Sequence, residues 1–398
     1  MLKIYSRKAI SKQPLTCLAW TLFFTLVTIT PSSAIAQTKN VEVSNCRLAK
    51  VNNETLSTGF PRNSSLIPTT GTIKSLFLYV DFLDNKSTGI PKGFTEQYAT
   101  TAKKFLDAQS YGRAKFVFES SPRVYRINKN SSIYRLISDG QGDAKTLIQD
   151  AINASDAEID FAQYDFLTIV PPKDTTTILT GGAMTGGSGL FQSQERTFSS
   201  AVVIGKNKLS NFAMPGFGWS FYSHEVGHIL GITHPYFQRE GQPAAIWDLM
   251  GNGGTSVPEF IGWHRFLLDW LTESEIACFA GSSFTNSQLA LTPLNTAGKG
   301  KKMVVITLNA RQALVIEARR ASTYDKLQKH EEGTLVYRVD VSKGDDKGII
   351  TILGNKGTKR EGQTLESIKL GESVSSNGFV IKVISSSKSG DTVQISKK

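Results

Sequence analysis

One stretch decides how this sequence is organised: His224-Glu225-Val226-Gly227-His228-Ile229-Leu230-Gly231-Ile232-Thr233-His234, which holds three of its five histidines. A helix turns once in about 3.6 residues, so His224 and His228 project from one face and can reach the same metal ion. Gly231 can take the positive φ that ends a helix sharply, and the chain can then return His234 to that ion. Three imidazoles leave the fourth position of a tetrahedral zinc ion for water, as in catalytic zinc sites.

Glu225 directly follows the first of these histidines. From there its carboxylate can hydrogen-bond a water on the metal without becoming a ligand. The sequence therefore predicts one catalytic Zn²⁺ held by His224, His228 and His234, with Glu225 as general base. An amphipathic helix with surface histidines is the alternative, and the complete spacing disfavours it.

A methionine follows downstream, in Trp247-Asp248-Leu249-Met250-Gly251. His-Glu-x-x-His-x-x-Gly-x-x-His followed by such a methionine turn resembles the metzincin zinc metallopeptidases. Within that group the chain is most similar to the immune inhibitor A-type family, with gametolysin-like enzymes as the alternative. The similarity also includes Tyr111-Gly112-Arg113, Tyr164-Asp165-Phe166 and the segment 333–340. The resemblance implies a secreted, zinc-dependent endopeptidase that cleaves internal peptide bonds, with Met250 in the turn beneath the metal.

The chain departs from the metzincin pattern just after Met250. Some metzincins have a tyrosine there that assists the oxyanion, whereas this sequence has Gly251 and Asn252, and Tyr236 is the candidate substitute. Two other functions stay open: a secreted binding protein or adhesin with a vestigial zinc site, and a zinc hydrolase that acts on a non-peptide amide. The presence of Glu225 argues against the first, because binding alone needs no base.

The N-terminus has the pattern of a signal peptide. A basic start precedes an apolar run at 15–29, and Ala34-Ile35-Ala36 suits cleavage before Gln37. A membrane anchor is the alternative, but the run is short and Pro31 follows it. We therefore expect a secreted or periplasmic protein without stable membrane insertion. Loss of four basic residues would lower the formal charge from +11 to +7. The lysines are scattered, so we expect no nucleic-acid partner, a monomer, and protein or peptide substrates.

The chain has three cysteines, and Cys17 would leave with the signal peptide. In an oxidising compartment, Cys46 and Cys278 are expected to form one disulfide. Alternatively, the Cys46 thiolate occupies the open zinc position and keeps the enzyme latent.

Patterning predicts an α/β (α+β) metzincin-like catalytic domain at 73–284 with an active-site helix. An extended N-terminal segment at 37–72 precedes it, and a β-sandwich-like C-terminal domain at 285–398 follows. Strands are expected at 73–82, 114–119, 166–170 and 200–205, and helices at 94–109, 143–152 and 260–270. Further short strands are expected at 289–294, 302–308, 313–319, 333–340, 348–352, 379–385 and 392–395.

Three further features of the sequence carry predictions. The glycine-rich segment 181–189 has too many glycines for regular structure, so we expect a loop. Asp81 and Asp84, near the end of the first strand, are candidates for a structural Ca²⁺ site, with solvated turn residues as the alternative. His264 and His330 have no ligand-spaced neighbours and are expected to be structural or exposed.

Overall fold

The computed structural model describes residues 37–398, with gaps at 52–53, 94–98, 139–140, 187–188, 210–217, 236–246, 252–258, 328, 330, 345–346, 355–358, 361–362 and 365–366. Side chains are also not described at 208–209, 359–360 and 363–364. The expected signal peptide at 1–36 therefore lies outside the described residues. Among the described residues, no helix is both long and apolar enough to cross a membrane.

A six-stranded sheet forms the first half of the described chain, in the order β2-β1-β4-β8-β5 with β3 also paired to β1. Its strands are parallel except for β5, which runs antiparallel to β8 at one edge. The strands are β1 Gly71–Phe82, β2 Ala114–Ser120, β3 Tyr125–Ile127, β4 Phe166–Val170, β5 Gly182–Thr185 and β8 Ser200–Val203. Central strands such as β4 are buried throughout, because helices cover both faces of the sheet.

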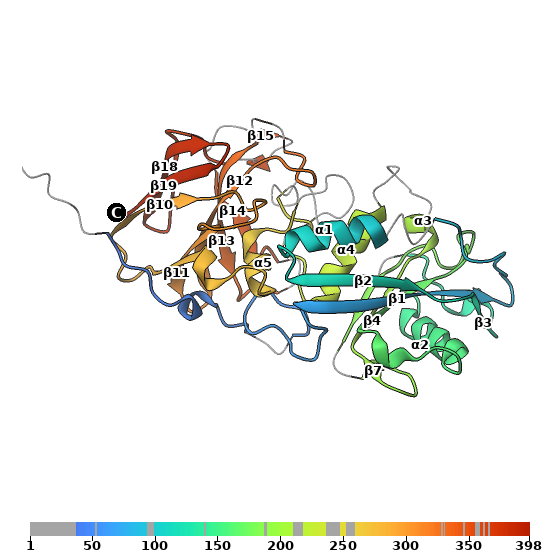
Figure 1. The fold of residues 1–398 in the computed structure, drawn as a ribbon. Helices are drawn as coiled ribbons and strands as arrows, with labels where there is room; N and C mark the ends of the chain where they lie inside the picture. Colours follow the sequence, from blue (N-terminus) through green and yellow to red (C-terminus); the bar gives the residue numbers. More distant parts are fainter. Residues whose placement is uncertain are drawn as a thin grey trace, which may run out of the picture. The chain divides into compact units, whose positions relative to one another are not determined.

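Helices cover the sheet on opposite sides, as Figure 1 shows. Helices α1 (Thr101–Gln109) and α4 (Gly218–Ile229) share one core with one face of the sheet. Helix α2 (Ala144–Ser155) packs on the other face, and the Asp143 side chain caps it by accepting a hydrogen bond from the Thr146 amide at 2.8 Å. This layering places α4, with its histidines, against the sheet beside β5. Short elements complete this half: η3 Ser131–Ile133, η4 Phe161–Gln163, β6 Phe191–Gln192, β7 Thr197–Phe198 and α3 Lys206–Leu209.

The second half consists mainly of two larger sheets. The five-stranded sheet has the order β14-β13-β12-β11-β9, and the four-stranded sheet has the order β10-β19-β18-β17. Their inward side chains form a shared core, so they pack face to face. The strands are β9 Ile276–Ala280, β10 Asn286–Leu291, β11 Met303–Asn309, β12 Gln312–Arg319, β13 Gly333–Asp340, β14 Ile350–Ile352, β17 Ser373–Ser376, β18 Phe379–Ser387 and β19 Gly390–Lys397, beside the small pair β15 Lys359–Arg360 and β16 Gln363–Thr364.

The two halves belong to one compact unit, Gln37–Lys398. The outer face of the five-stranded sheet packs on α5 (Gly262–Leu267) and into the same core as α1 and α4. Strand β9 also belongs to this sheet, although it precedes residue 285. The boundary expected between residues 284 and 285 is therefore not a boundary in the packing.

The N-terminal segment contributes buried structure although it has little regular secondary structure beyond η1 (Val43–Cys46). Cys46 and Cys278 form a disulfide that joins this segment to β9, as expected from the sequence. The backbone carbonyls of Thr58 and Thr69 accept hydrogen bonds from the indoles of Trp263 and Trp270, each at 2.8 Å. The segment is thus an integral part of the fold.

Several expected elements differ from the observed ones. The glycine-rich segment at 181–189, expected to be a loop, contains strand β5. Gly181 allows this because a Cβ there would lie 2.1 Å from the Val203 carbonyl oxygen of the neighbouring strand. The helix expected at 260–270 shortens to α5, and the one expected at 94–109 is observed as α1, with 94–98 outside the described residues.

Candidate metal centre

Helix α4 ends at the glycine between the second and third histidines. Gly231 has φ +102°, its amide donates to the His228 carbonyl at 2.8 Å, and the Ile232 amide donates to the Gly227 carbonyl at 3.0 Å. This pair of bonds is a Schellman motif, which ends a helix through a residue in the left-handed region. Arg62 also donates to the Leu230 carbonyl at 3.2 Å. The reversal brings His234 back toward the helix, as the sequence predicts.

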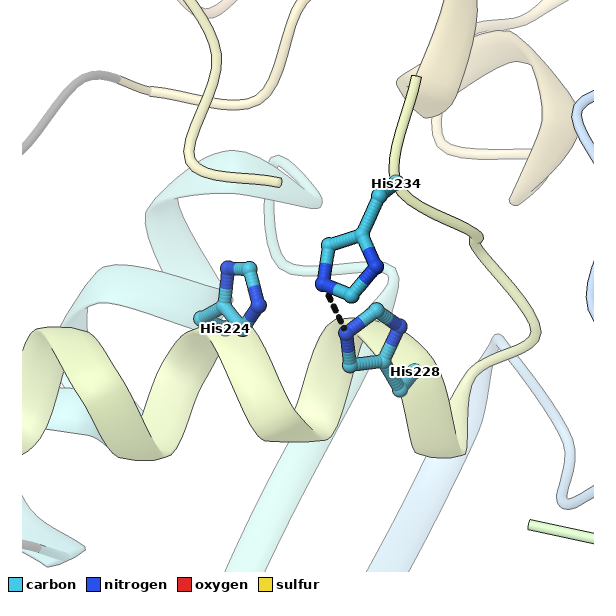
Figure 2. A group of neighbouring side chains, drawn as sticks. All are labelled: His224, His228 and His234. Carbon is cyan, nitrogen blue, oxygen red and sulfur yellow. Dashed lines mark hydrogen bonds between the residues drawn. The ribbon is translucent and has the colours of Figure 1, made fainter. Parts of the chain in front are cut away.

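The three histidines converge. His224 and His228 rise from α4, and His234 approaches them from the segment after the turn (Figure 2). One ring nitrogen from each lies within 4.8 Å of the others, and the Nε2 atoms of His228 and His234 are 3.0 Å apart. With metal–nitrogen bonds of about 2.0–2.1 Å, tetrahedral zinc would hold two such nitrogens about 3.3 Å apart. The distance between His228 and His234 is close to this value, and the three histidines could hold one metal ion.

Backbone carbonyls orient two of the rings. His224 Nδ1 lies 2.8 Å from the Leu249 carbonyl oxygen, and His228 Nδ1 lies 2.7 Å from the Ile232 carbonyl oxygen. A carbonyl oxygen only accepts, so Nδ1 carries the hydrogen in each neutral ring and Nε2 carries the lone pair. Histidines that bind a metal commonly donate their other N–H in this way. A three-histidine group that could hold a metal ion is therefore present.

Glu225 is anchored beside the histidines by the neighbouring sheet. It is 7% exposed, and one carboxylate oxygen, Oε2, accepts a hydrogen bond from the Ala183 amide of β5 at 2.6 Å. A Cβ on Gly182 would lie 3.3 Å from the same oxygen, so the glycine provides room for the carboxylate. The hydrogen bond thus orients the Glu225 carboxylate next to His224, the first of the three histidines.

The turn Trp247–Gly251 lies against α4, and we call it the floor. Met250 is fully buried, and a Cβ on Gly227 of α4 would lie only 2.3 Å from its sulfur. The Gly251 amide donates to the Asp248 carbonyl at 3.0 Å and closes the turn. Leu249 lies between these residues and supplies the carbonyl that orients His224. The floor therefore contacts helix α4 through a side chain and a backbone group.

Other sequence predictions have different outcomes. Cys46 is in the disulfide, so the alternative in which its thiolate occupies the metal position is wrong for this structure. Arg126 contacts both oxygens of Asp81, and Ser131 binds both oxygens of Asp84 through its amide and hydroxyl. These contacts satisfy both carboxylates, so the predicted calcium site is not supported.

Of the remaining candidate residues, the structure describes only His264. His264 is fully buried, with Nδ1 2.8 Å from Asp248 Oδ2, so its role is structural. His330, Asn252 and Tyr236 lie outside the described residues.

Sequence reasoning missed the groups that orient the site. The carbonyls of Leu249 and Ile232 and the amide of Ala183 are backbone atoms, which carry no residue-type signal. The pair Gly181-Gly182 was the available clue, since glycine within a strand often marks a close approach of another group.

The chain was also compared with known proteins. A scan against family models and a search of curated proteins find no match to it. Its function is therefore inferred from its own residues and their geometry.

Proposed function

We propose that this chain is a secreted zinc-dependent endopeptidase of the metzincin type, which hydrolyses internal peptide bonds of proteins. The observation that carries the proposal is the convergence of His224, His228 and His234 next to an anchored Glu225. A zinc ion bound there would polarise the scissile carbonyl and lower the pKa of a coordinated water towards about 7.

Glu225 is the residue that moves the proton. Its carboxylate takes the proton from the attacking water and passes it to the leaving amine, so no covalent enzyme intermediate is needed. The Ala183 amide holds one carboxylate oxygen, which limits rotation of the side chain during this transfer. Nδ1 of His224 and of His228 donates to a carbonyl, which keeps both rings in the ligand tautomer.

Strand β5 favours a peptide as the substrate. It pairs with β8 on one side, and no described strand pairs with it on the other. Its four residues are half-buried and lie beside Glu225. An extended peptide can add to such an edge through main-chain hydrogen bonds, which would place a backbone carbonyl near the three histidines.

The test is mass-spectrometric mapping of the products from a diverse peptide library. It uses the zinc-loaded protein, the same protein after chelation, and Glu225→Gln. We expect Glu225→Gln to retain zinc and to lose about 10²- to 10⁴-fold in turnover. Glu273→Gln is the matched control, because Glu273 is exposed in η6 (Glu273–Glu275), and it should cleave normally.

Each contrary result has a distinct meaning. Cleavage that persists in Glu225→Gln would exclude this residue as the base. A folded, zinc-loaded protein that cuts no peptide would favour the binding-protein alternative.

A further inference from the structure

The five-stranded sheet reaches the floor through one strand. Along β12, alternate side chains face opposite sides, and Leu314 and Ile316 enter the core between the two sheets. Glu317 and Arg319 occupy positions that face the other way, toward α5 and the floor. Their side chains are 0% and 1% exposed. Two fully buried charges in a mostly apolar strand require a physical explanation.

Arg319 connects the sheet to the floor. Its Nη1 donates to the Trp247 carbonyl at 2.9 Å, and its guanidinium lies 5.6 Å from the centroid of the Trp247 ring. Its Nε and Nη2 both bind Asp325 Oδ2, at 3.0 and 2.6 Å, and Nη1 also binds Glu317 at 3.1 Å. One planar side chain thus joins two carboxylates to the first residue of the floor.

The Arg319 guanidinium keeps its positive charge although it is buried. Burial alone would lower the pKa of Arg319, but the charges of Asp325 and Glu317 more than offset burial and raise that pKa. Glu317 is fixed in turn, because its Oε2 accepts from the Gly262 amide at 2.8 Å and from the Tyr337 hydroxyl at 2.9 Å. The guanidinium is therefore held from both sides when it binds Trp247.

We propose that Arg319 is a positioning residue for the metal centre. It holds the Trp247 carbonyl, and two residues later the Leu249 carbonyl orients the His224 ring. The second half of the chain then forms part of the metal centre although it supplies no ligand. This inference rests on the proposed zinc site. It gives the five-stranded sheet a role, which the proposed function does not.

The test compares Arg319→Lys with Arg320→Lys in the full mature chain. Lysine keeps the positive charge but cannot reach Trp247, Asp325 and Glu317 together. The neighbouring Arg320 binds Asp391 at 3.2 Å and the Ser387 carbonyl at 2.8 Å, within the second half. Both variants should lower the unfolding temperature of the metal-free protein.

The measurements that discriminate are the zinc dissociation constant, from competition with a chromogenic chelator, and the visible spectrum of the cobalt-substituted protein. Arg319→Lys should raise the dissociation constant about tenfold, the low end of the effect of outer partners of ligands, and should change the cobalt spectrum. Arg320→Lys should alter neither. Unchanged zinc affinity and an unchanged cobalt spectrum in a folded Arg319→Lys protein would overturn the proposal.

Two further measurements cover failure of folding and failure of the proposed function. If Arg319→Lys does not fold, Asp325→Asn replaces it, because this variant keeps the arginine and weakens its contact with residue 325. Asp325→Asn should raise the zinc dissociation constant less than about tenfold. An unchanged dissociation constant would refute the positioning role. Neither the zinc dissociation constant nor the cobalt spectrum requires a substrate. A protein that binds zinc but cleaves nothing would therefore contradict the proposed peptidase function and leave the positioning role of Arg319 standing. If the wild type binds no zinc, ¹⁵N spectra of the metal-free proteins decide, since Arg319→Lys should alter the His224 tautomer signal and an unaltered signal would refute the role.

Discussion

The floor, Trp247–Gly251, and the edge strand β5 contact the same helix, yet they are held in different ways. Trp247, Leu249 and Met250 are fully buried, and Arg319 of the five-stranded sheet donates a hydrogen bond to the Trp247 carbonyl. Strand β5 is half-buried and pairs with β8 alone among the described strands. The floor orients His224, whereas β5 orients Glu225.

Under the proposed function, this difference separates metal binding from proton transfer. The ligands depend on buried packing, which resists displacement because neighbouring side chains leave little free space. The base depends on a partly exposed backbone amide at the edge where a peptide would bind. Changes to the floor should therefore alter metal affinity, and changes to β5 should alter turnover.

Removing the disulfide should have the largest effect on stability. It tests whether the floor and β5 both depend on the stability of the whole fold. Cys46→Ala/Cys278→Ala should lower the free energy of unfolding by about 2–5 kcal/mol, because the bond closes a long loop. Chemical denaturation measures this loss, and the zinc affinity of the folded variant should stay unchanged. Two free thiols in the unfolded, unreduced mature wild type would contradict the pairing.

Gly227→Ala tests the floor. The new methyl group would lie 2.3 Å from the Met250 sulfur, so the buried methionine must shift, and we expect the adjacent Leu249 carbonyl to shift with it. We expect zinc affinity to fall about 10- to 100-fold, while turnover of the zinc-saturated protein changes little. Met250→Ala in the same background removes the clash and should restore part of the affinity. Wild-type affinity in Gly227→Ala alone would show that the contact does not hold the ligands.

Ala183→Pro tests β5 and should have the smallest effect. Proline removes the amide hydrogen that binds Glu225, at an edge position where it breaks no bond to β8. Turnover should fall roughly tenfold, because the base loses one orienting contact, and zinc affinity should not change. Ala183→Gly is the matched control, since it changes the same side chain and keeps the amide hydrogen that binds Glu225. A loss of zinc affinity in Ala183→Pro would end the separation between the two regions.

Local patterns in the sequence predicted much of the fold. Alternating apolar residues marked β1, and a compact apolar run marked β4 with its bounds Phe166–Val170. The glycine-rich segment did not predict β5, because Gly181 and Gly182 leave room for closely packed neighbours rather than forming a turn. The role of the buried charges of β12 could not be predicted, because alternation shows which side of the sheet a residue faces but not which residues pack against that side.

For the candidate metal centre, the amino-acid sequence alone was enough to predict the three histidines, their helical spacing and the glycine that ends the helix. These depend on the geometry of a few consecutive residues, which is the same wherever a helix forms. Folding of the whole chain was needed to show which backbone groups orient His224 and Glu225, and that Arg319 binds the floor. Such contacts join segments far apart in the chain, and a backbone carbonyl or amide is present at nearly every residue, so no local pattern distinguishes the one that folding brings to the site.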